Sequence, residues 1–553
     1  MFQTCGGDNT GSGTKVPEPA PIKLVALKVD GVSAGFDYTL SGNNPEIEIT
    51  FSADIDRATV PAAVKWTDKD NKSIEWEVAF RNNDSAMIIQ SKLPLDWLSK
   101  YTLSVSDSFQ SKSGGSLRLP IAVNLTTWID ATDKFPRISD EDLLNLVQKQ
   151  TFGYFWDGAE PTSGLARERY HSDDIYPQND KNVVTSGGSG FGIMAMISAI
   201  ETGYITREQG LERFTQIMNW LEKADRFHGA FPHWWTGETG KVKPFSQYDD
   251  GGDLVETAYL FQGLLSLRQY YKNGNEEEKA IAARIDKLWR EVEFDWYRNG
   301  QNVLYWHWSP QYEWKMNFPV KGWNECLIVY ILAAASPTHG VPAEVYHEGW
   351  AQSGKLSASS EVEGYPLQLF QQVHPVGPLF WEHYSFLGLD PRGLKDRYGD
   401  YWTENVNQTL INRAYCIRNP KGYKGYGADC WGLTSGYSIE GYAGHAPYES
   451  ADLGVISPTA ALSSIVYTPE YSMDALRYFY YTLGDRIWGK YGFYDAFSMT
   501  DDWFPQRYLA IDQGPIPVMI ENHRSELLWN LFMSHPDVQS GLRKLDFESP
   551  HLK

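Results

Sequence analysis

Hydrophobic and polar positions alternate along the first part of the chain. From about residue 22 to residue 125 they follow a period of two, in short runs separated by turn residues. Because side chains on a strand point alternately to opposite faces, this period predicts strands buried on one face. The runs are IKLVALKVDG, EIEITFSADID, AVKWT, SIEWEVAF, SAMIIQS, YTLSVSD and IAVNLTT. These seven short strands predict an antiparallel β-sandwich over residues 21–127.

A helical period replaces the alternation after residue 139. Ser139 is an expected N-cap, and Glu141 and Asp142 follow in the first turn, where acidic side chains complement the helix dipole. Further helices are expected near residues 190–202, 206–224, 253–272, 276–298, 322–335, 342–350, 397–417, 458–466, 472–488, 517–533 and 536–545. About twelve helices predict a closed (α/α)6 barrel over residues 140–553, although no sequence repeat is visible. The predicted fold class is mainly α, with a small all-β domain before the barrel.

Two segments are expected to connect rather than to fold. Residues 128–139 read as a linker, and residues 1–20 as a flexible tether of small, polar and Pro-rich composition. Cys5 before such a tract is typical of a lipid-modified bacterial protein whose apolar signal has been removed, which predicts a periplasmic or outer-membrane-anchored location. A tail with an incidental cysteine is the alternative, and the sequence leaves both open.

Composition narrows the possible ligands. The 49 basic and 70 acidic side chains give a net charge of −21, which argues against nucleic acid as a partner. The longest apolar run, from Cys326 to Ala335, has ten residues, whereas a membrane-spanning helix needs ~20. The four cysteines lack metal-binding spacing, and neither a metal nor a cofactor is predicted. Cys416 and Cys430 could form a disulfide, but reduced thiols are expected in so large a domain.

Acidic residues crowd the start of one predicted helix. In SQYDDGGDLVETAYL, Asp253 and Glu256 share a helix face, and Asp249 and Asp250 lie just before it. A D-x-x-E capping box explains the first two residues without any functional role. However, four carboxylates in eight residues exceed the needs of a cap, and like charges this close raise a pKa when they are shielded from water. We therefore take Asp249, Asp253 and Glu256 as site candidates.

Two further carboxylates lie in apolar or loop surroundings. Glu325 begins the most apolar helix, where it either pairs with Lys321 or acts as an acid whose pKa is raised by an apolar wall. Asp512 lies before a Gly-Pro turn and is a candidate, whereas Glu521 in the next helix is expected to be structural.

Aromatic residues make up 14% of the chain, more than a core needs. Trp and Tyr combine a flat apolar face with a polar edge, which suits half-wet clefts. The candidates for a sugar-binding surface are Trp234, Trp235, Trp308 and Trp323, with Arg167 as a polar partner. About half of the loop tryptophans are expected to be packing residues instead. The glycine run GGSGFG lacks the spacing of a phosphate-binding loop and predicts close helix packing.

Several segments together resemble a known family. TFGYFWDGAEPTSGLARER, GAFPHWW, DDGGDLVETAYLFQGLL, GWNECLIVYILAAASPTH and IDQGPIPVMIENHRS are similar to the bacterial glucoamylase-like proteins that include glycoside hydrolase family 144. The resemblance covers roughly residues 140–545, and the N-terminal segment resembles bacterial immunoglobulin-like modules. The resemblance implies an (α/α)6 barrel enzyme that cleaves neutral β-1,2-glucan in endo mode, or in exo mode with release of sophorose. The protein is expected to be a monomer.

The resemblance also implies roles for individual residues. Glu325 would be the general acid, Asp512 would help to activate water, and Asp253 would complete the catalytic set, with Asp249 and Glu256 binding the sugar ring. An inverting outcome follows from the resemblance alone. Two alternatives stay open: a glycan-binding protein without catalysis, and an α-glucan exo-hydrolase. A polysaccharide lyase fits less well, because its uronate substrates favour a cationic cleft.

Overall fold

The computed structural model describes residues 18–176, 180–370 and 373–552. The chain divides into two compact units, unit 1 up to Ala131 and unit 2 from Thr132 onward. Cys5 and the first part of the tether lie outside the described residues, so the lipid modification stays a prediction.

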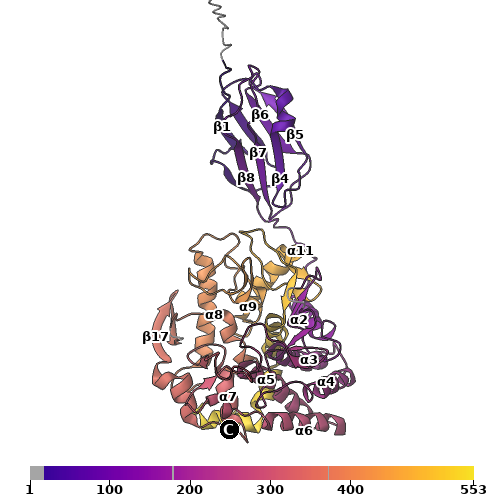
Figure 1. The fold of residues 1–553 in the computed structure, drawn as a ribbon, viewed down its shortest axis with the longest axis vertical. Coiled ribbons are helices and arrows are strands. Elements are labelled where there is room, and N and C mark those ends of the chain that lie inside the picture. The colour runs from indigo at the N-terminus through magenta and orange to yellow at the C-terminus, as the bar shows by residue number, and fades with distance from the viewer. Residues whose placement is uncertain (1–17, 177–179, 371–372, 553) are drawn as a thin grey trace, which may run out of the picture. The chain divides into compact units, whose positions relative to one another are not determined.

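Unit 1 consists of two four-stranded sheets around one core (Figure 1). The sheet orders are β1-β3-β6-β5 and β2-β8-β7-β4. The bounds are β1 Leu24–Val29, β2 Asp37–Leu40, β3 Ile47–Phe51, β4 Val64–Asp68, β5 Trp76–Arg81, β6 Ala86–Ser91, β7 Lys100–Val105 and β8 Ile121–Thr127, with the short helix α1 at Val60–Ala63. Alternate side chains such as Ile47, Ile49 and Phe51 are buried, as the period of two predicts.

One strand of unit 1 was not predicted. The short β2 pairs with β8 in parallel, so the expectation of purely antiparallel pairing was wrong. Its four residues, DYTL, are too few to show a clear alternation, and β2 forms the edge of its sheet.

Unit 2 is rich in helices (Figure 1). Their bounds are α2 Asp140–Trp156, α3 Ser186–Glu201, α4 Arg207–Leu221, α5 Leu254–Tyr271, α6 Glu276–Arg290, α7 Leu327–Ala335, α8 Tyr401–Arg418, α9 Pro458–Leu462, α10 Pro469–Arg477, α11 Gly484–Ile487, α12 Ala510–Gln513, α13 Pro515–Ser525, α14 Leu527–Met533 and α15 Pro536–Lys544. Ser139 caps α2, as predicted, by accepting the Asp142 N–H.

Local backbone chemistry explains where the helices differ from the prediction. The helix predicted from residue 322 begins only at Leu327, because Gly322 has a φ of +80° and the Asn324 side chain accepts the Cys326 N–H. The helix predicted over 517–533 is divided into α13 and α14 at Glu526, which adopts a left-handed φ of +60°.

The glycine run packs α3 against α5. A Cβ on Gly190 would lie 2.2 Å from the Tyr259 carbonyl oxygen, and a Cβ on Gly263 would lie 2.2 Å from the Gly190 oxygen. Only glycine permits two helix backbones to approach this closely. The predicted role of this run in helix packing is confirmed.

Short antiparallel ladders occupy the long connections of unit 2. Their bounds are β9 Arg169–His171, β10 Val183–Thr185, β11 Trp234–Thr236, β12 Lys241–Val242, β13 Gly252–Asp253, β14 Leu304–Tyr305, β15 His307–Trp308, β16 Pro319–Val320, β17 Ser357–Val362, β18 Tyr365–Leu369, β19 Ser435–Ser438, β20 Gly441–Gly444, β21 Trp488–Gly489, β22 Gly492–Phe493 and β23 Arg507–Leu509. The pairs β13·β15 and β9·β23 join segments that are far apart in the sequence.

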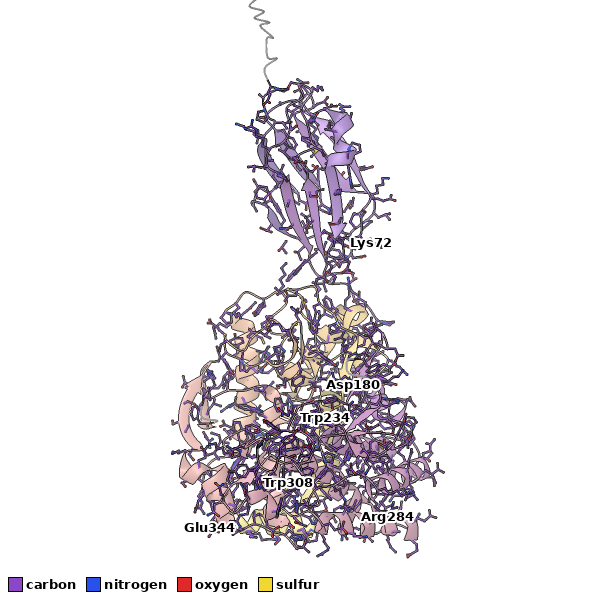
Figure 2. All side chains as sticks on the ribbon, in the orientation of Figure 1. Lys72, Asp180, Trp234, Arg284, Trp308 and Glu344 are labelled. Atoms are coloured by element: carbon purple, nitrogen blue, oxygen red, sulfur yellow. The ribbon has the colours of Figure 1, made fainter. Side chains whose placement is uncertain are left out.

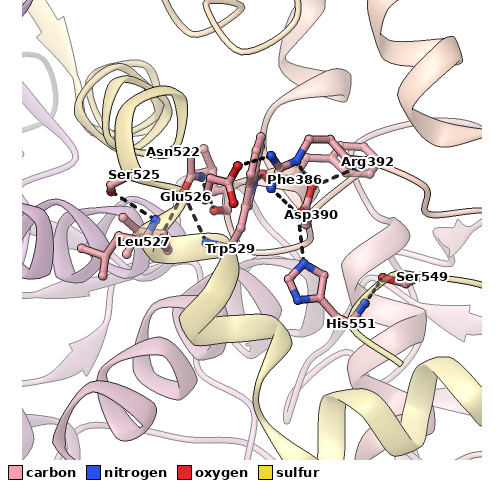
Figure 3. A network of polar contacts seen from close by, with 12 residues as sticks. Phe386, Asp390, Arg392, Asn522, Ser525, Glu526, Leu527, Trp529, Ser549 and His551 are labelled. Carbon is pink, nitrogen blue, oxygen red and sulfur yellow. Dashed lines mark hydrogen bonds and ion pairs between the residues drawn. The ribbon is translucent and has the colours of Figure 1, made fainter. Parts of the chain in front are cut away.

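A polar network fixes the last helices to the loop after residue 385 (Figure 3). Asp390 accepts hydrogen bonds from Arg392 at 2.7 Å and is paired with His551 at 2.9 Å. Arg392 also pairs with Glu526 and lies over the ring of Trp529. The residue that divides α13 from α14 is thus held by a charge partner.

The described cysteines, Cys326, Cys416 and Cys430, are buried free thiols, so the alternative of a Cys416–Cys430 disulfide is wrong. None of the described helices combines the length and the apolarity that a membrane span requires.

Candidate active site

The N-terminus of α5 presents two buried carboxylates. Asp253 is the N-cap, and its side chain accepts the Glu256 N–H at 2.9 Å and the Trp306 indole N–H at 2.9 Å. Glu256 does not close a capping box. Its Oε2 instead accepts the Gly187 N–H at 2.8 Å, at the N-terminus of α3. Glu256 is therefore held between two helix N-termini, where a negative charge is stabilised.

His233 lies between these two carboxylates. Its Nδ1 is 3.3 Å from Asp253 Oδ2, and its Nε2 is 3.6 Å from Glu256 Oε1. Burial by itself would lower the pKa of His233, but the charges of Glu256 and Asp253 raise it to about 10. His233 is therefore expected to be protonated at neutral pH. Burial and Asp253 raise the pKa of Glu256 to about 7, against the opposing charge of His233.

Asp249 approaches from the loop before α5. Its Oδ1 is 3.7 Å from His307 Nε2, which also accepts the Gly251 N–H. Burial raises the pKa of Asp249 to about 6. The ladder β13·β15 places His307 opposite Asp253, so a second histidine faces the same acidic group.

Glu325 lies in the turn before α7 and is partly buried. Burial raises the pKa of its carboxyl to about 7, so it carries a proton for much of the time near neutral pH. Among the groups that act on the Glu325 carboxyl in the described part of the chain, burial is the largest and Lys321 is absent. The alternative of a Lys321–Glu325 ion pair is therefore not supported, and the role of Glu325 as the acid stays a prediction.

Asp512 lies on the one-turn helix α12 and is 1% exposed. Tyr384 donates its hydroxyl proton to Asp512 Oδ1 at 3.5 Å. Burial, and after it the charges of Asp512, Glu256 and Glu325 among others, raise the pKa of Tyr384 well above its usual value. Tyr384 therefore contacts Asp512 directly and is within the electrostatic influence of acids from two further segments, Glu256 and Glu325.

A cavity of about 360 Å³ opens beside His233. Its lining combines aromatic faces with charged groups: Glu168, Arg169, Asp180, His233, Trp234, Phe245, Tyr437, Tyr442, Leu509 and Ile511. Figure 2 marks Asp180 and Trp234 within unit 2. Trp234 stacks on His233 with 3.5 Å between ring centroids and packs against Phe245 at 4.4 Å, so these rings form an aromatic wall of the cavity. A larger surface pocket, of about 560 Å³ beside α4, holds none of the candidate acids.

Four of the predicted tryptophan and arginine binding residues do not line the cavity. Trp323 and Trp235 are fully buried in the core, so their faces cannot contact a substrate. The Arg167 guanidinium donates to the carbonyl oxygens of Gly158 and Ala159 and fixes a loop. The neighbouring Arg169 enters the cavity instead, where it is 3.0 Å from Asp180.

Trp308, which Figure 2 labels in unit 2, packs edge-on against His228 and Trp296 and is not part of the cavity lining. The predictions that Trp323, Trp235 and Arg167 contact substrate do not fit their burial and bonding, because aromatic or basic composition does not determine which way a side chain points.

Sequence reasoning missed several residues of this site. His233 stands within the quoted segment GAFPHWW but was not taken as a candidate. Asp495, which is buried next to Asp512, lies in none of the segments that carried a candidate. Among the described residues, no three His, Cys, Asp or Glu side chains are grouped as metal ligands.

Comparisons with known proteins agree with this geometry. A family model named Glycoamylase, described as "Putative glucoamylase", matches residues 317–536. The chain is 42% identical to an exo β-1,2-glucooligosaccharide sophorohydrolase (non-reducing end) from Parabacteroides distasonis, with 95% of this chain and 76% of that protein covered. The chain belongs to glycoside hydrolase family 144.

Two solved structures extend the comparison within family 144. An endo-β-1,2-glucanase from Chitinophaga pinensis, in complex with sophorotriose and glucose, is 68% identical, with a TM-score of 0.75, and the match covers 75% of this chain and 100% of that chain. A β-1,2-glucanase from P. distasonis is 37% identical, with a TM-score of 0.70, over 96% of this chain and 73% of that one. The helix-rich unit with a small sheet-containing region is therefore the fold of the family.

Proposed function

We propose that this protein hydrolyses β-1,2-glucan or its oligosaccharides. The observation that carries the proposal is the convergence of Glu256, Glu325 and Asp512 around Tyr384, beside a cavity with an aromatic wall. The named members of family 144 described above act on β-1,2-glucans. A site of acids and aromatic rings suits a neutral sugar, whose hydroxyls donate to carboxylates while its apolar faces stack on rings.

The proposed reaction uses Glu325 as the general acid. Its pKa of about 7 lets it hold a proton at neutral pH and deliver that proton to the glycosidic oxygen, directly or through a sugar hydroxyl. The bond between the anomeric carbon and the leaving oxygen breaks as the proton arrives. Water attacks the anomeric carbon, and its proton passes to the Asp512 carboxylate.

Asp249, Asp253 and Glu256 are proposed to hold the sugar ring and to set the charge of the site. The His233 cation compensates part of the negative charge of Asp253 and Glu256. The proposed stereochemical outcome is inversion, which needs room for a water molecule and separates the acid from the base by roughly 6.5–9.5 Å.

Digestion of linear β-1,2-glucan tests the proposal. Products are resolved by chromatography over time, with starch as the control substrate. Sophorose as the sole product identifies exo action, and a mixture of oligosaccharides identifies endo action. Cleavage of starch alone supports the α-glucan alternative, and binding of β-1,2-glucan without any product supports a glycan-binding protein; either result overturns the assignment.

We also propose a more detailed architecture for the two units. The helices of unit 2 are proposed to close into an (α/α)6 barrel, and unit 1 to be an immunoglobulin-like domain. Two sheets around a shared core support the second statement. A crystal structure with a bound β-1,2-glucooligosaccharide tests the barrel, the domain and the acids that touch the scissile oxygen.

The proposed location is the periplasm or the outer membrane, with Cys5 as the lipid-bearing residue and the protein as a monomer. Mass spectrometry of the native protein tests the modification, because a diacylglycerol on Cys5 adds a defined mass. An unmodified Cys5 contradicts it. Light scattering of the purified protein tests the monomer.

A further inference from the structure

Two buried aspartates lie together at the base of the site. Asp512 is 1% exposed and Asp495 is 2% exposed, and the two carboxyls are within hydrogen-bonding reach of each other. They come from different segments, since Asp512 lies on α12 and Asp495 follows β22. The Asp495 N–H is bonded to the Arg507 carbonyl oxygen at 2.9 Å, which fixes the loop beside β23.

Each carboxyl has one oxygen with a donor and one without. Asp495 Oδ2 accepts the Tyr437 N–H at 2.7 Å, and Asp512 Oδ1 accepts the Tyr384 hydroxyl. Asp495 Oδ1 and Asp512 Oδ2 are buried, and no N–H or O–H of the described residues reaches either oxygen. Since a buried acceptor without a donor is costly, a proton held between the two carboxyls is the arrangement that satisfies both.

The groups around the pair favour a single shared charge. Glu168 adds a further negative charge near Asp512, and Tyr442 lies within electrostatic reach of both aspartates. Tyr437 and Tyr384 contribute the two donors already described. Burial, followed by Asp495, raises the pKa of Asp512 well above its usual value, and burial raises the pKa of Asp495 to about 6. Two carboxylates this close cannot both ionise without strong repulsion.

We propose that Asp495 and Asp512 form one proton-sharing pair, in which Asp495 positions Asp512 and sets its basicity for the attacking water. The role of Asp495 in setting the basicity of Asp512 rests on the proposed function. In the reaction the pair enters with one proton and one negative charge. The attacking water forms its bond to the anomeric carbon and gives a proton to Asp512, while Asp495 keeps the shared proton. Asp495 is thus a positioning residue that acts through Asp512.

The decisive variant is Asp495→Asn. An asparagine keeps an oxygen that can accept the Tyr437 N–H and offers an amide N–H to Asp512, so the anchoring of the loop is preserved while the shared proton is lost. Asp495→Ala removes both the acceptor for the Tyr437 N–H and the shared proton. If Asp495 only anchors the loop, Asp495→Asn behaves like the wild type and Asp495→Ala does not.

The first measurement is independent of any substrate. A carboxyl with a raised pKa contributes stability that is complete below its unfolded pKa of about 4 and is lost as the pH rises through the folded value. Replacing Asp495 by Asn removes the repulsion that develops over that range. We expect the difference in Tm between Asp495→Asn and wild type to become more favourable to the variant from pH 4 to pH 8. An equal difference at both pH values overturns the pair.

The second measurement is the pH profile of kcat on β-1,2-glucan. In the one-proton state Asp495 donates its O–H to the ionised Asp512, and the amide N–H of asparagine is a weaker donor, so the pKa at which Asp512 takes up a proton rises and the acid limb of kcat moves to higher pH by about one unit or more. The matched control is Asp396→Asn, because Asp396 is another buried carboxyl with a raised pKa, hydrogen-bonded to Tyr346. An acid limb that stays in place for Asp495→Asn overturns the positioning role. An inactive wild type overturns the proposed function instead, and the Tm measurement still decides whether the pair exists.

Discussion

At the scale of single residues, the site is a set of carboxyls whose environments differ. Glu325 has its pKa raised by burial, whereas Glu256 is acted on by burial, by Asp253 and by the opposing charge of His233. Enzymes that cleave glycosidic bonds need one carboxyl that is protonated and another that is ionised at the same pH. The differences between these environments are what allow similar side chains to take different roles.

Replacing Glu325 by Gln tests the acid. The amide has nearly the same shape but holds no transferable proton, so we expect kcat on β-1,2-glucan to fall by at least about 10²-fold. KM and Tm should change little. Asp546→Asn, at an exposed carboxylate that pairs with Arg397, serves as the control. Turnover of Glu325→Gln close to the wild-type value would eliminate Glu325 as the proton donor.

Replacing His233 by Gln tests the cation between Asp253 and Glu256. A histidine with a pKa raised from 6.5 to about 10 contributes stability that is complete below pH 6.5 and lost as the pH rises through 10. We therefore expect the wild type to exceed His233→Gln in Tm at pH 6 and the gap to narrow towards pH 10. A gap that is independent of pH would show that His233 is neutral in the folded protein.

The acids could be predicted from the sequence, whereas the partners that set their charge could not. Asp249, Asp253 and Glu256 crowd a Gly-Gly turn, and that local pattern is visible in one chain. His233 and Asp495 meet their carboxylates only after folding, because 20 and 17 positions separate them from Asp253 and Asp512. The sequence also does not show which of two adjacent tryptophans is buried. Trp234 lines the cavity, whereas Trp235 is in the core.

At the scale of elements, the site depends on how closely α3 and α5 pack. The Gly187 N–H at the start of α3 binds Glu256 on α5, and a Cβ on Gly187 would lie 2.3 Å from the Glu256 carboxylate. The helical period predicts both helices, and the glycine run predicts close packing there without identifying the partner helix. The start of α7 was predicted less well, because Gly322 and Asn324 delay the helix beyond Glu325.

Replacing Gly190 by Ala tests this helix contact. The new methyl group would collide with the Tyr259 carbonyl oxygen, which belongs to backbone and cannot swing away. Overpacking of this kind costs about 1–3 kcal/mol, so we expect a lower Tm in calorimetry. Gly427→Ala is the matched control, since its Cβ would meet only the Gly425 oxygen at 3.9 Å. An unchanged Tm for Gly190→Ala would mean that α3 and α5 are not in contact at this glycine.

At the scale of the whole molecule, the candidate acids all belong to unit 2. Unit 1 has its own core, built from residues such as Ile47, Trp66 and Leu103, and contributes no residue to the cavity. The period of two predicts this sheet unit well, because one face of each strand is buried. The parallel edge strand β2 was not predicted, because its four residues are too few to show an alternation of buried and exposed positions.

Expression of residues 132–553 alone tests how far the two units are independent. Since unit 2 contains its own core and the candidate acids, we expect it to fold and to cleave β-1,2-glucan with a kcat/KM of the same order of magnitude as the full chain. Circular dichroism of the purified fragment checks its folding. A folded fragment that has lost activity would assign unit 1 a part in catalysis.

The stacking of His233 on Trp234 has a consequence for how members of this family can diverge. One short loop supplies both part of the aromatic wall of the cavity and the positive charge that balances two acids. A mutation that reshapes this wall for a different glycosidic linkage would also shift the imidazole and disturb the acidity of its neighbours. Linkage preference and pH optimum are therefore expected to change together when this loop is engineered.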